Sequence, residues 1–161
     1  MAVYSEDAYD DIHPLLYQGI MSLQHRGQKG FGYVIQDMAQ YGNGLLSDVM
    51  IQSYKGNLGI ASVRYAFSKD KVNEPLLPKQ MGDYYIAYDG AYTDYENKLD
   101  DLECLHEILS KHQGAFAFVA INHHKMIAMR DCLGIKPLVM GKQGDTWFFA
   151  SESCALEIIN V

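Results

Sequence analysis

The sequence predicts an α+β fold in which two mainly antiparallel β-sheets pack together and helices cover their outer faces. Short segments rich in β-branched and aromatic residues are separated by Gly, Asn and Lys, whereas only two segments show the apolar spacing of a helix. A helix does not follow each strand, so a doubly wound parallel sheet is not expected. The 161 residues carry no internal repeat or linker, which predicts a single domain over residues 1–161.

The first helix is expected over residues 10–26. Its apolar residues recur at helical spacing: Ile12, Leu15, Leu16, Ile20 and Leu23. Asp10 or Asp11 can cap the start, and Pro14 is acceptable in a first turn. Gly27 follows the last apolar residue and can end the helix.

A second helix is expected over residues 96–112, because its leucines and Ile108 share one face and Gly114 follows it. Strands are expected on both sides of this helix. Before it they are "FGYVIQD" (31–37), "LLSDVMIQSY" (45–54), "LGIASVRYAF" (58–67) and "DYYIAYDGAY" (83–92). After it they are "AFAFVAI" (115–121), "KMIAMRD" (125–131), "KPLVMGK" (136–142) and "TWFFASE" (146–152), with hairpin turns at "NHHK" and "KQGD".

Composition limits the partners that are expected. The formal net charge of −7 gives no electrostatic support for binding nucleic acid. The apolar runs are too short to cross a bilayer, so no membrane partner is expected. Cys104, Cys132 and Cys154 fit neither a disulfide framework nor a zinc site, and are expected to be small apolar core residues in a reduced, cytoplasmic protein. His123 and His124 are expected in a solvated turn, with no metal and no cofactor.

Eight stretches, in order along the chain, resemble the N-terminal glutaminase domain of amidophosphoribosyltransferase, the first enzyme of purine synthesis. They are "LQHRGQKGFG" (23–32), "GLLSDVM" (44–50), "KGNLGIASVRY" (55–65), "NEPL" (73–76), "AYDGAY" (87–92), "GAFAFV" (114–119), "RDCLGIKPLVMGK" (130–142) and "ASESCAL" (150–156). The resemblance implies a class II glutamine amidotransferase with the N-terminal-nucleophile (Ntn) hydrolase fold, a four-layer α/β/β/α sandwich. No stretch resembles the family's phosphoribosyl-pyrophosphate loop, so this chain is not expected to make phosphoribosylamine unaided.

The resemblance also implies a chemistry. In the family an N-terminal cysteine attacks the side-chain amide of glutamine, and its own α-amine acts as the base. An ungapped alignment from Gln24 places this cysteine at Met1, whereas an alignment on "AVYS" places it before Met1. A thioether has no proton to lose, and removal of Met1 would expose Ala2. Either alignment leaves the chain as written without the nucleophile.

Further family positions carry over residue by residue. The oxyanion hole, an Asn-Gly pair in the family, falls on Asp89 and Gly90, and an ionised Asp accepts hydrogen bonds where an Asn amide donates them. Taken alone, "YDGAY" also predicts a tight hairpin turn. Arg64, followed by Tyr65, matches the Arg that binds the carboxylate of glutamine, whereas Phe67 replaces a small hydroxyl residue and is expected to fill the pocket.

Other matches are expected to be structural. His25 and Arg26 are expected mainly to stabilise the fold, and Arg64 is also compatible with a structural ion pair. The family's acceptor for the α-amine of glutamine lies in a segment that is shorter here. Asp100 and Asp101 lie in this segment. They are expected at the solvated start of a helix and not as substitutes for that acceptor.

The sequence therefore predicts a glutaminase-type domain that has lost ordinary glutaminase activity and is kept for binding or regulation. A glutamine-like small molecule, a separate phosphoribosyltransferase chain or self-association are the expected partners. Two alternatives stay open. The first is an active glutaminase whose cysteine lies upstream of Met1. The second is a purely structural descendant of the fold, with a closed pocket plugged by Phe67.

Overall fold

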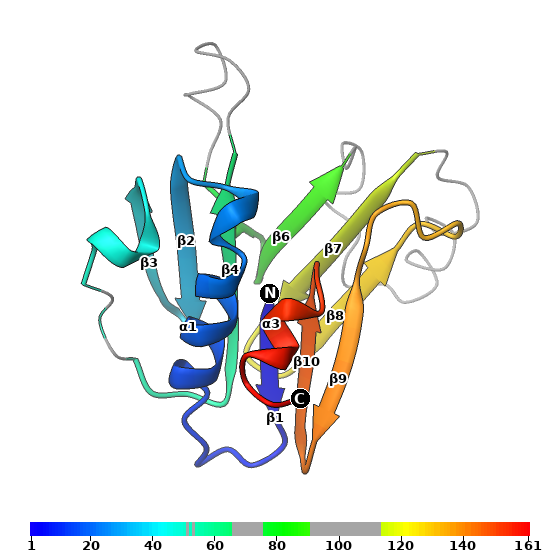
Figure 1. The fold of residues 1–161 in the computed structure, drawn as a ribbon. Coiled ribbons are helices and arrows are strands. Elements are labelled where there is room, and N and C mark those ends of the chain that lie inside the picture. Colours follow the sequence, from blue (N-terminus) through cyan, green and yellow to red (C-terminus); the bar gives the residue numbers. More distant parts are fainter. Residues whose placement is uncertain (51, 53, 66–75, 91–113) are drawn as a thin grey trace.

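The computed structural model describes residues 1–50, 52, 54–65, 76–90 and 114–161 (Figure 1). The helices in this part of the chain are α1 (His13–Ser22) and α3 (Cys154–Glu157), with 3₁₀ turns η1 (Gln24–Arg26) and η2 (Leu46–Asp48). The first five strands are β1 (Ala2–Ser5), β2 (Gly30–Ile35), β3 (Met38–Asn43), β4 (Leu58–Arg64) and β5 (Lys79–Met81). The others are β6 (Tyr84–Gly90), β7 (Phe116–Ile121), β8 (Met126–Arg130), β9 (Val139–Gln143) and β10 (Thr146–Ala150).

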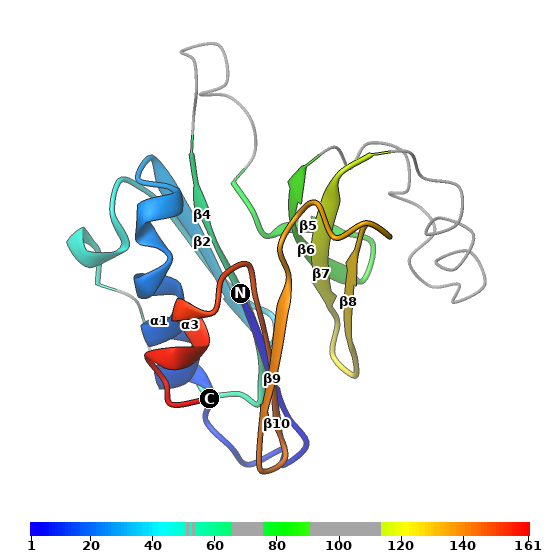
Figure 2. The same cartoon turned by 45° about the vertical axis from the view of Figure 1, so that its right-hand side comes forward.

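The strands form two antiparallel sheets, which confirms the predicted fold class. The six-stranded sheet has the order β3-β2-β4-β1-β10-β9, and the four-stranded sheet has the order β5-β6-β7-β8. Figure 2 shows α1 and α3 together on the outer face of the six-stranded sheet, with the four-stranded sheet on its other side. The helix predicted over 96–112, which would supply the fourth layer, lies outside the described residues.

Among the described residues, buried apolar side chains form three clusters. One lies between the helices and the six-stranded sheet and includes Leu16, Ile20 and Phe148. A second lies between the two sheets, where Ile60 packs in the same cluster as Val119. The third is on the outer face of the four-stranded sheet. Because two clusters share the six-stranded sheet, its central strands are buried on both faces, as β2 and the first half of β4 show.

β1 was not predicted, yet it lies at the centre of the larger sheet. Its four residues pair with β10 on one side and with β4 on the other. Ala2 and Val3 are completely buried. A strand this short, followed directly by acidic residues, gives little signal in the sequence. Its position brings the start of the chain into the middle of the fold.

The first helix is shorter than predicted. It begins at His13 rather than at residue 10, and Asp11 caps the turn before it by accepting a hydrogen bond from the His13 N–H at 3.1 Å. Asp10 instead accepts a hydrogen bond from the Ser5 hydroxyl. The helix ends at Ser22, and the chain continues through η1 to Gly27.

Two sequence-based expectations about strands are wrong. The described residues of the segment 45–54, which are 45–50, 52 and 54, form no strand; η2 lies among them, and β3, just before them, pairs with β2 instead. Asp89 and Gly90 do not form a tight hairpin. They are the last residues of β6 and pair with Ala117 and Phe116 of β7, so the chain between the two strands spans residues 91–115.

A close approach of two backbones makes Gly27 necessary. A Cβ atom at this position would lie 2.4 Å from the carbonyl carbon of Arg64 and 2.7 Å from its nitrogen. Backbone in a paired strand cannot move aside, so we expect Gly27→Ala to lower the free energy of unfolding by about 2–3 kcal/mol. Urea denaturation measures this change.

Gly144→Ala is the matched control. Gly144 has a φ of +58°, and a Cβ there would meet nothing within 4 Å. Only the backbone conformation opposes this substitution, and a loss of about 1 kcal/mol is expected. Equal losses in the two variants would contradict the steric explanation for Gly27.

Candidate functional site

A cavity of about 830 Å³ opens where β1 begins and where β4 and β6 end. Residues from both sheets and from the α1–η1 segment line it. The polar ones are Arg26, Ser62, Arg64, Tyr65, Lys79, Tyr88, Asp89 and Ser151. The apolar ones include Met1, Ile20, Leu23, Leu77, Ala87, Ala117, Val119, Leu138 and Phe149. The cavity therefore brings together Met1, Arg64, Tyr65, Asp89 and Gly90, five of the six site residues predicted from the sequence.

Met1 lies at the inner end of the cavity. Its α-amino group donates a hydrogen bond to the carbonyl oxygen of Ala61 at 2.8 Å, and the Ala61 N–H donates to the Met1 carbonyl oxygen at the same distance. Its thioether packs against Gly19 of α1, where an added Cβ would overlap the sulfur. Burial, with a smaller contribution from the charge of Arg26, lowers the pKa of the α-amino group from 8.0 to about 5. At neutral pH this amine is an uncharged but weak base.

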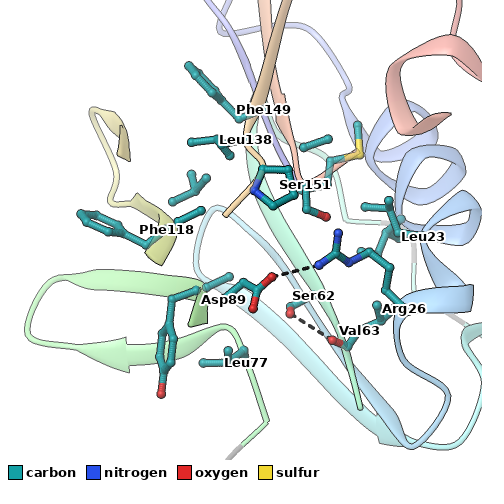
Figure 3. A pocket seen from close by; sticks show the side chains of 18 of the residues that line it. Leu23, Arg26, Ser62, Val63, Leu77, Asp89, Phe118, Leu138, Phe149 and Ser151 are labelled. Atoms are coloured by element: carbon teal, nitrogen blue, oxygen red, sulfur yellow. Dashed lines mark hydrogen bonds and ion pairs between the residues drawn. The ribbon is translucent and has the colours of Figure 1, made fainter. Parts of the chain in front are cut away.

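Asp89 reaches across the cavity to two cations. Its Oδ2 accepts a hydrogen bond from Nη2 of Arg26 at 2.9 Å, the contact drawn in Figure 3, and its Oδ1 accepts one from Nζ of Lys136 at 2.8 Å. Arg26 belongs to η1, on the side of the six-stranded sheet, whereas Asp89 ends a strand of the smaller sheet. The ion pair with Arg26 therefore links the two sheets across the cavity, and the ion pair with Lys136 ties the end of β6 to the loop between β8 and β9.

Glu152 continues this network on the other side of Arg26. Its carboxylate accepts a hydrogen bond from Nη1 of Arg26 at 2.9 Å and contacts Nε2 of His25 at 2.8 Å. Nδ1 of His25 lies 3.0 Å from the Ser22 carbonyl oxygen, so both ring nitrogens face acceptors. Partial burial opposes ionisation of Glu152, but the hydrogen bond from His25 and the charge of Arg26 outweigh it and lower the pKa. The ion pairs assigned to His25 and Arg26 agree with their predicted role in stabilising the fold.

A second carboxylate, Asp131, positions Lys136. It is 5% exposed and accepts hydrogen bonds from the backbone N–H groups of Phe116, Leu133, Ile135 and Lys136, at 2.9–3.3 Å. Bonds from Lys136 and Ile135, the largest contributions, hold the pKa of Asp131 below its usual value. The Asp131 carboxylate thus holds the loop between β8 and β9 in place, and Lys136 in this loop reaches Asp89.

Sequence reasoning missed Lys136, Asp131 and Glu152. Each lies in a stretch that resembles the family, but no short spacing links any of them to Asp89 or Arg26. Glu152, for example, is separated from Arg26 by 126 positions. The signal that was available is "RDCLGIK", where an Asp is followed by a Gly with positive φ and then by a Lys.

The other predicted residues fall elsewhere. Phe67, Asp100, Asp101 and Cys104 lie outside the described residues. Cys132 is exposed, so its expected place in the core is wrong, whereas Cys154 is half-buried against the core. His123 lies in the predicted β7–β8 turn, where Nε2 is 3.4 Å from a carboxylate oxygen of Asp37. Across the described ranges, no group of three potential metal ligands comes together, and no helix is long and apolar enough to span a membrane.

The described lining carries more cationic than acidic side chains, which suits an anion. Arg26, Arg64 and Lys79 are cationic, and Asp89 is the single acidic residue of the described lining. An oxyanion requires hydrogen-bond donors aimed at it, and an ionised carboxylate supplies none. The thioether of Met1 has no hydrogen to lose and is a poor nucleophile compared with a thiolate.

Comparisons with known proteins agree with this fold. Residues 91–157 match the family described as "Glutamine amidotransferase domain". Amidophosphoribosyltransferase 3, chloroplastic, of Arabidopsis thaliana is 30% identical over 91% of this chain and 35% of its own length. Amidophosphoribosyltransferase of Bacillus subtilis is 28% identical over 94% of this chain and 40% of its own length.

The solved structure of the B. subtilis glutamine phosphoribosylpyrophosphate amidotransferase, complexed with ADP and GMP, superimposes with a TM-score of 0.70. It is 26% identical in sequence, and the match covers 98% of this chain and 42% of that one. The chain thus spans less than half the length of these relatives. Its fold and sequence show that it is a glutamine amidotransferase-type domain with the Ntn-hydrolase fold, related to the glutaminase domain of the amidophosphoribosyltransferases.

Proposed function

We propose that this domain binds a small molecule in the cavity between its sheets and does not hydrolyse glutamine at an ordinary rate. It acts as a binding or regulatory domain of the amidophosphoribosyltransferase type. The proposal rests on two features: the fold and its cavity are kept, whereas the residues at the family's nucleophile and oxyanion positions differ from those of the family.

The observation that carries the proposal is that residue 89 is an acidic side chain paired with two cations. The resemblance places this residue where the family has the Asn of the oxyanion hole. Its side chain is paired with both Arg26 and Lys136, at 2.9 and 2.8 Å. A negative charge at this point opposes the negative charge that develops on the amide oxygen during attack. The argument depends on internal residues and is independent of how the chain begins.

Met1 adds a second reason. It occupies the position beside Arg26 and Ala61 that the ungapped alignment assigns to the nucleophile. With a pKa of about 5, the α-amine is a weaker base than an ordinary α-amine with a pKa near 8. Both the attacking atom and its base are therefore unsuited to amide hydrolysis at neutral pH.

Ammonia release from glutamine tests the proposal directly. The purified chain is expected to release no more ammonia than a matched blank in an assay coupled to glutamate dehydrogenase. The alternative of an active glutaminase predicts codons for an N-terminal Met-Cys-Gly upstream of Met1 and ammonia release once these residues are restored. Ammonia release by the chain as written would contradict the proposal.

Two further candidates differ in what they predict for the cavity. A purely structural descendant of the fold requires a filled pocket, whereas the described residues surround about 830 Å³. This volume favours a binding role, because pockets for small ligands span roughly 300–1000 Å³. Phe67, the expected plug, lies outside the described residues.

A protein partner and a cellular location also belong to this proposal. The proposed partner is a separate phosphoribosyltransferase chain or a second copy of this domain. Sedimentation analysis of the domain alone and mixed with such a chain distinguishes these two from a monomer without a partner. A cytoplasmic location stays a prediction.

A further inference from the structure

We propose that the cavity takes an organic carboxylate with an apolar body, rather than an amino acid of the size of glutamine. The carboxylate end lies by Arg26 and Arg64, and the apolar body extends between the sheets against Ala87, Ala117 and Leu138. This inference rests on the binding function proposed above and names the class of ligand.

The shape of the apolar part comes from small side chains on one face of the smaller sheet. Ala87 and Asp89 of β6 point to the same face because they are two residues apart, and Asp89 pairs with Ala117 of β7. Both alanines line the cavity. Sheets pack about 10 Å apart when large side chains fill the space between them. Alanines in two neighbouring strands therefore leave a space beneath Asp89.

The opposite wall of this space is apolar. Leu138 and Phe149 come from the larger sheet and its connecting loop, and both pack in the cluster between the sheets. Figure 3 shows these two side chains beside each other on one side of the cavity, while Arg26 reaches in from another side. Leu77 supplies a further apolar contact. A polar molecule with the outline of glutamine would leave these surfaces uncovered, which favours a ligand with its own apolar part.

The polar end has the charge and the donors for a carboxylate. The described lining carries three cationic side chains, Arg26, Arg64 and Lys79, against one acidic side chain. Arg26 uses Nη1 for Glu152 and Nη2 for Asp89, so the guanidinium, with five N–H groups, has further donors for a ligand. Asp89 is already bonded to two cations, and the described lining offers no second carboxylate to hold a ligand amine. These features favour a simple carboxylate over an α-amino acid.

Isothermal titration calorimetry of the full chain with acetate, butyrate, hexanoate and 3-phenylpropionate tests the proposal. Each buried CH₂ is expected to tighten binding by about fourfold, until the apolar part of the cavity is filled. The neutral 3-phenylpropanamide is expected to bind at least about tenfold more weakly than 3-phenylpropionate, because it lacks the charge that Arg26 and Arg64 recognise. An affinity independent of chain length, or equal for the acid and its amide, would overturn the inference.

A pair of matched variants locates the ligand. Ala87→Leu fills the space between the sheets and is expected to weaken 3-phenylpropionate at least about tenfold while leaving acetate unchanged. Ala39→Leu makes the same change on the exposed edge strand β3 and is expected to leave both ligands unchanged. Thermal unfolding of each variant checks that it is folded. Equal binding of 3-phenylpropionate by Ala87→Leu and Ala39→Leu would place the ligand elsewhere and refute the site.

The outcomes also separate this inference from the proposed function. Binding of glutamine without binding of the apolar carboxylates refutes the ligand class and leaves a binding domain. Release of ammonia from glutamine refutes the proposed function, whatever the carboxylates do. A lack of heat with every carboxylate up to about 10 mM, far weaker than a specific site provides, overturns the inference.

Discussion

Asp131→Ala is expected to lower the free energy of unfolding by about 3–4 kcal/mol. The carboxylate of Asp131 accepts four backbone hydrogen bonds, from Phe116, Leu133, Ile135 and Lys136. Bonds to a charged group are stronger than neutral ones, and the substitution removes the acceptor shared by all four N–H groups. Urea denaturation at pH 7 measures the loss.

The same residue should impose a dependence on pH. Because the folded pKa of Asp131 lies below its ordinary value of 3.8, the carboxylate stabilises the fold at pH values above that value. This contribution is lost as the pH falls through the lowered folded pKa. Stability of the wild-type chain should thus fall more steeply than that of Asp131→Asn between pH 5 and pH 2. Glu152, whose pKa is also lowered, adds to the acid loss in both chains.

Asp83→Asn is the matched control for Asp131→Asn, because Asp83 is an exposed residue in the turn between β5 and β6. It should change stability by less than about 0.5 kcal/mol at neutral pH. If Asp131→Ala were no more destabilising than Asp83→Asn, the loop between β8 and β9 would not depend on this carboxylate. The position assigned to Lys136 would then need another explanation.

The second large effect is expected in amide hydrolysis, once a thiol is supplied. In Met1→Cys, produced behind an initiator methionine that is removed in the cell, the nucleophile is restored but Asp89 still opposes the oxyanion. Adding Asp89→Asn exchanges an acceptor for an amide donor and should raise the rate of ammonia release about 10²–10³-fold over Met1→Cys alone. Single-turnover assays with glutamine measure the ratio.

Two comparisons make this result specific. Asp37→Asn in the Met1→Cys background changes an Asp that pairs with His123 in a turn, and it should leave the rate unchanged. The Met1→Cys/Asp89→Asn chain must also show a cooperative thermal transition, since the change replaces two charged pairs by weaker contacts. Equal rates with Asp and Asn at position 89 would show that this residue does not face the reacting oxygen, and would remove the main support for the proposed function.

Strand composition and family-like stretches were enough to predict the α+β class and most of the strands. Their content of β-branched and aromatic residues placed β6, β7, β8 and β10 within one or two residues of their observed bounds. The prediction was wrong at residues 45–50, where Leu46 contacts the core from η2 and Val49 contacts it from the position after η2 rather than from a strand. Apolar residues in a sequence indicate that a segment is buried. In short segments, burial does not by itself distinguish a strand from a packed loop.

Only part of the candidate site could be predicted from the sequence. Met1, Arg64 and Asp89 were located by resemblance, and the structure brings them to one cavity. The ion-pair partners of Asp89 could not be predicted, because Arg26 lies 63 positions before it and Lys136 lies 47 positions after it. A salt bridge between such distant residues depends on the packing of the two sheets, and the spacing of residues along the sequence does not indicate it.

The sequence alone determined which side chains stand at two of the predicted site positions: residue 1 is a Met and residue 89 is an Asp. Those are covalent facts, so no arrangement of the chain can alter them. Only the tertiary structure decided that Asp89 pairs with Arg26 and Lys136, and that the Met1 amine is buried against Ala61. The reason is physical: charge state and burial depend on which groups surround a residue in space, and here those groups come from both sheets.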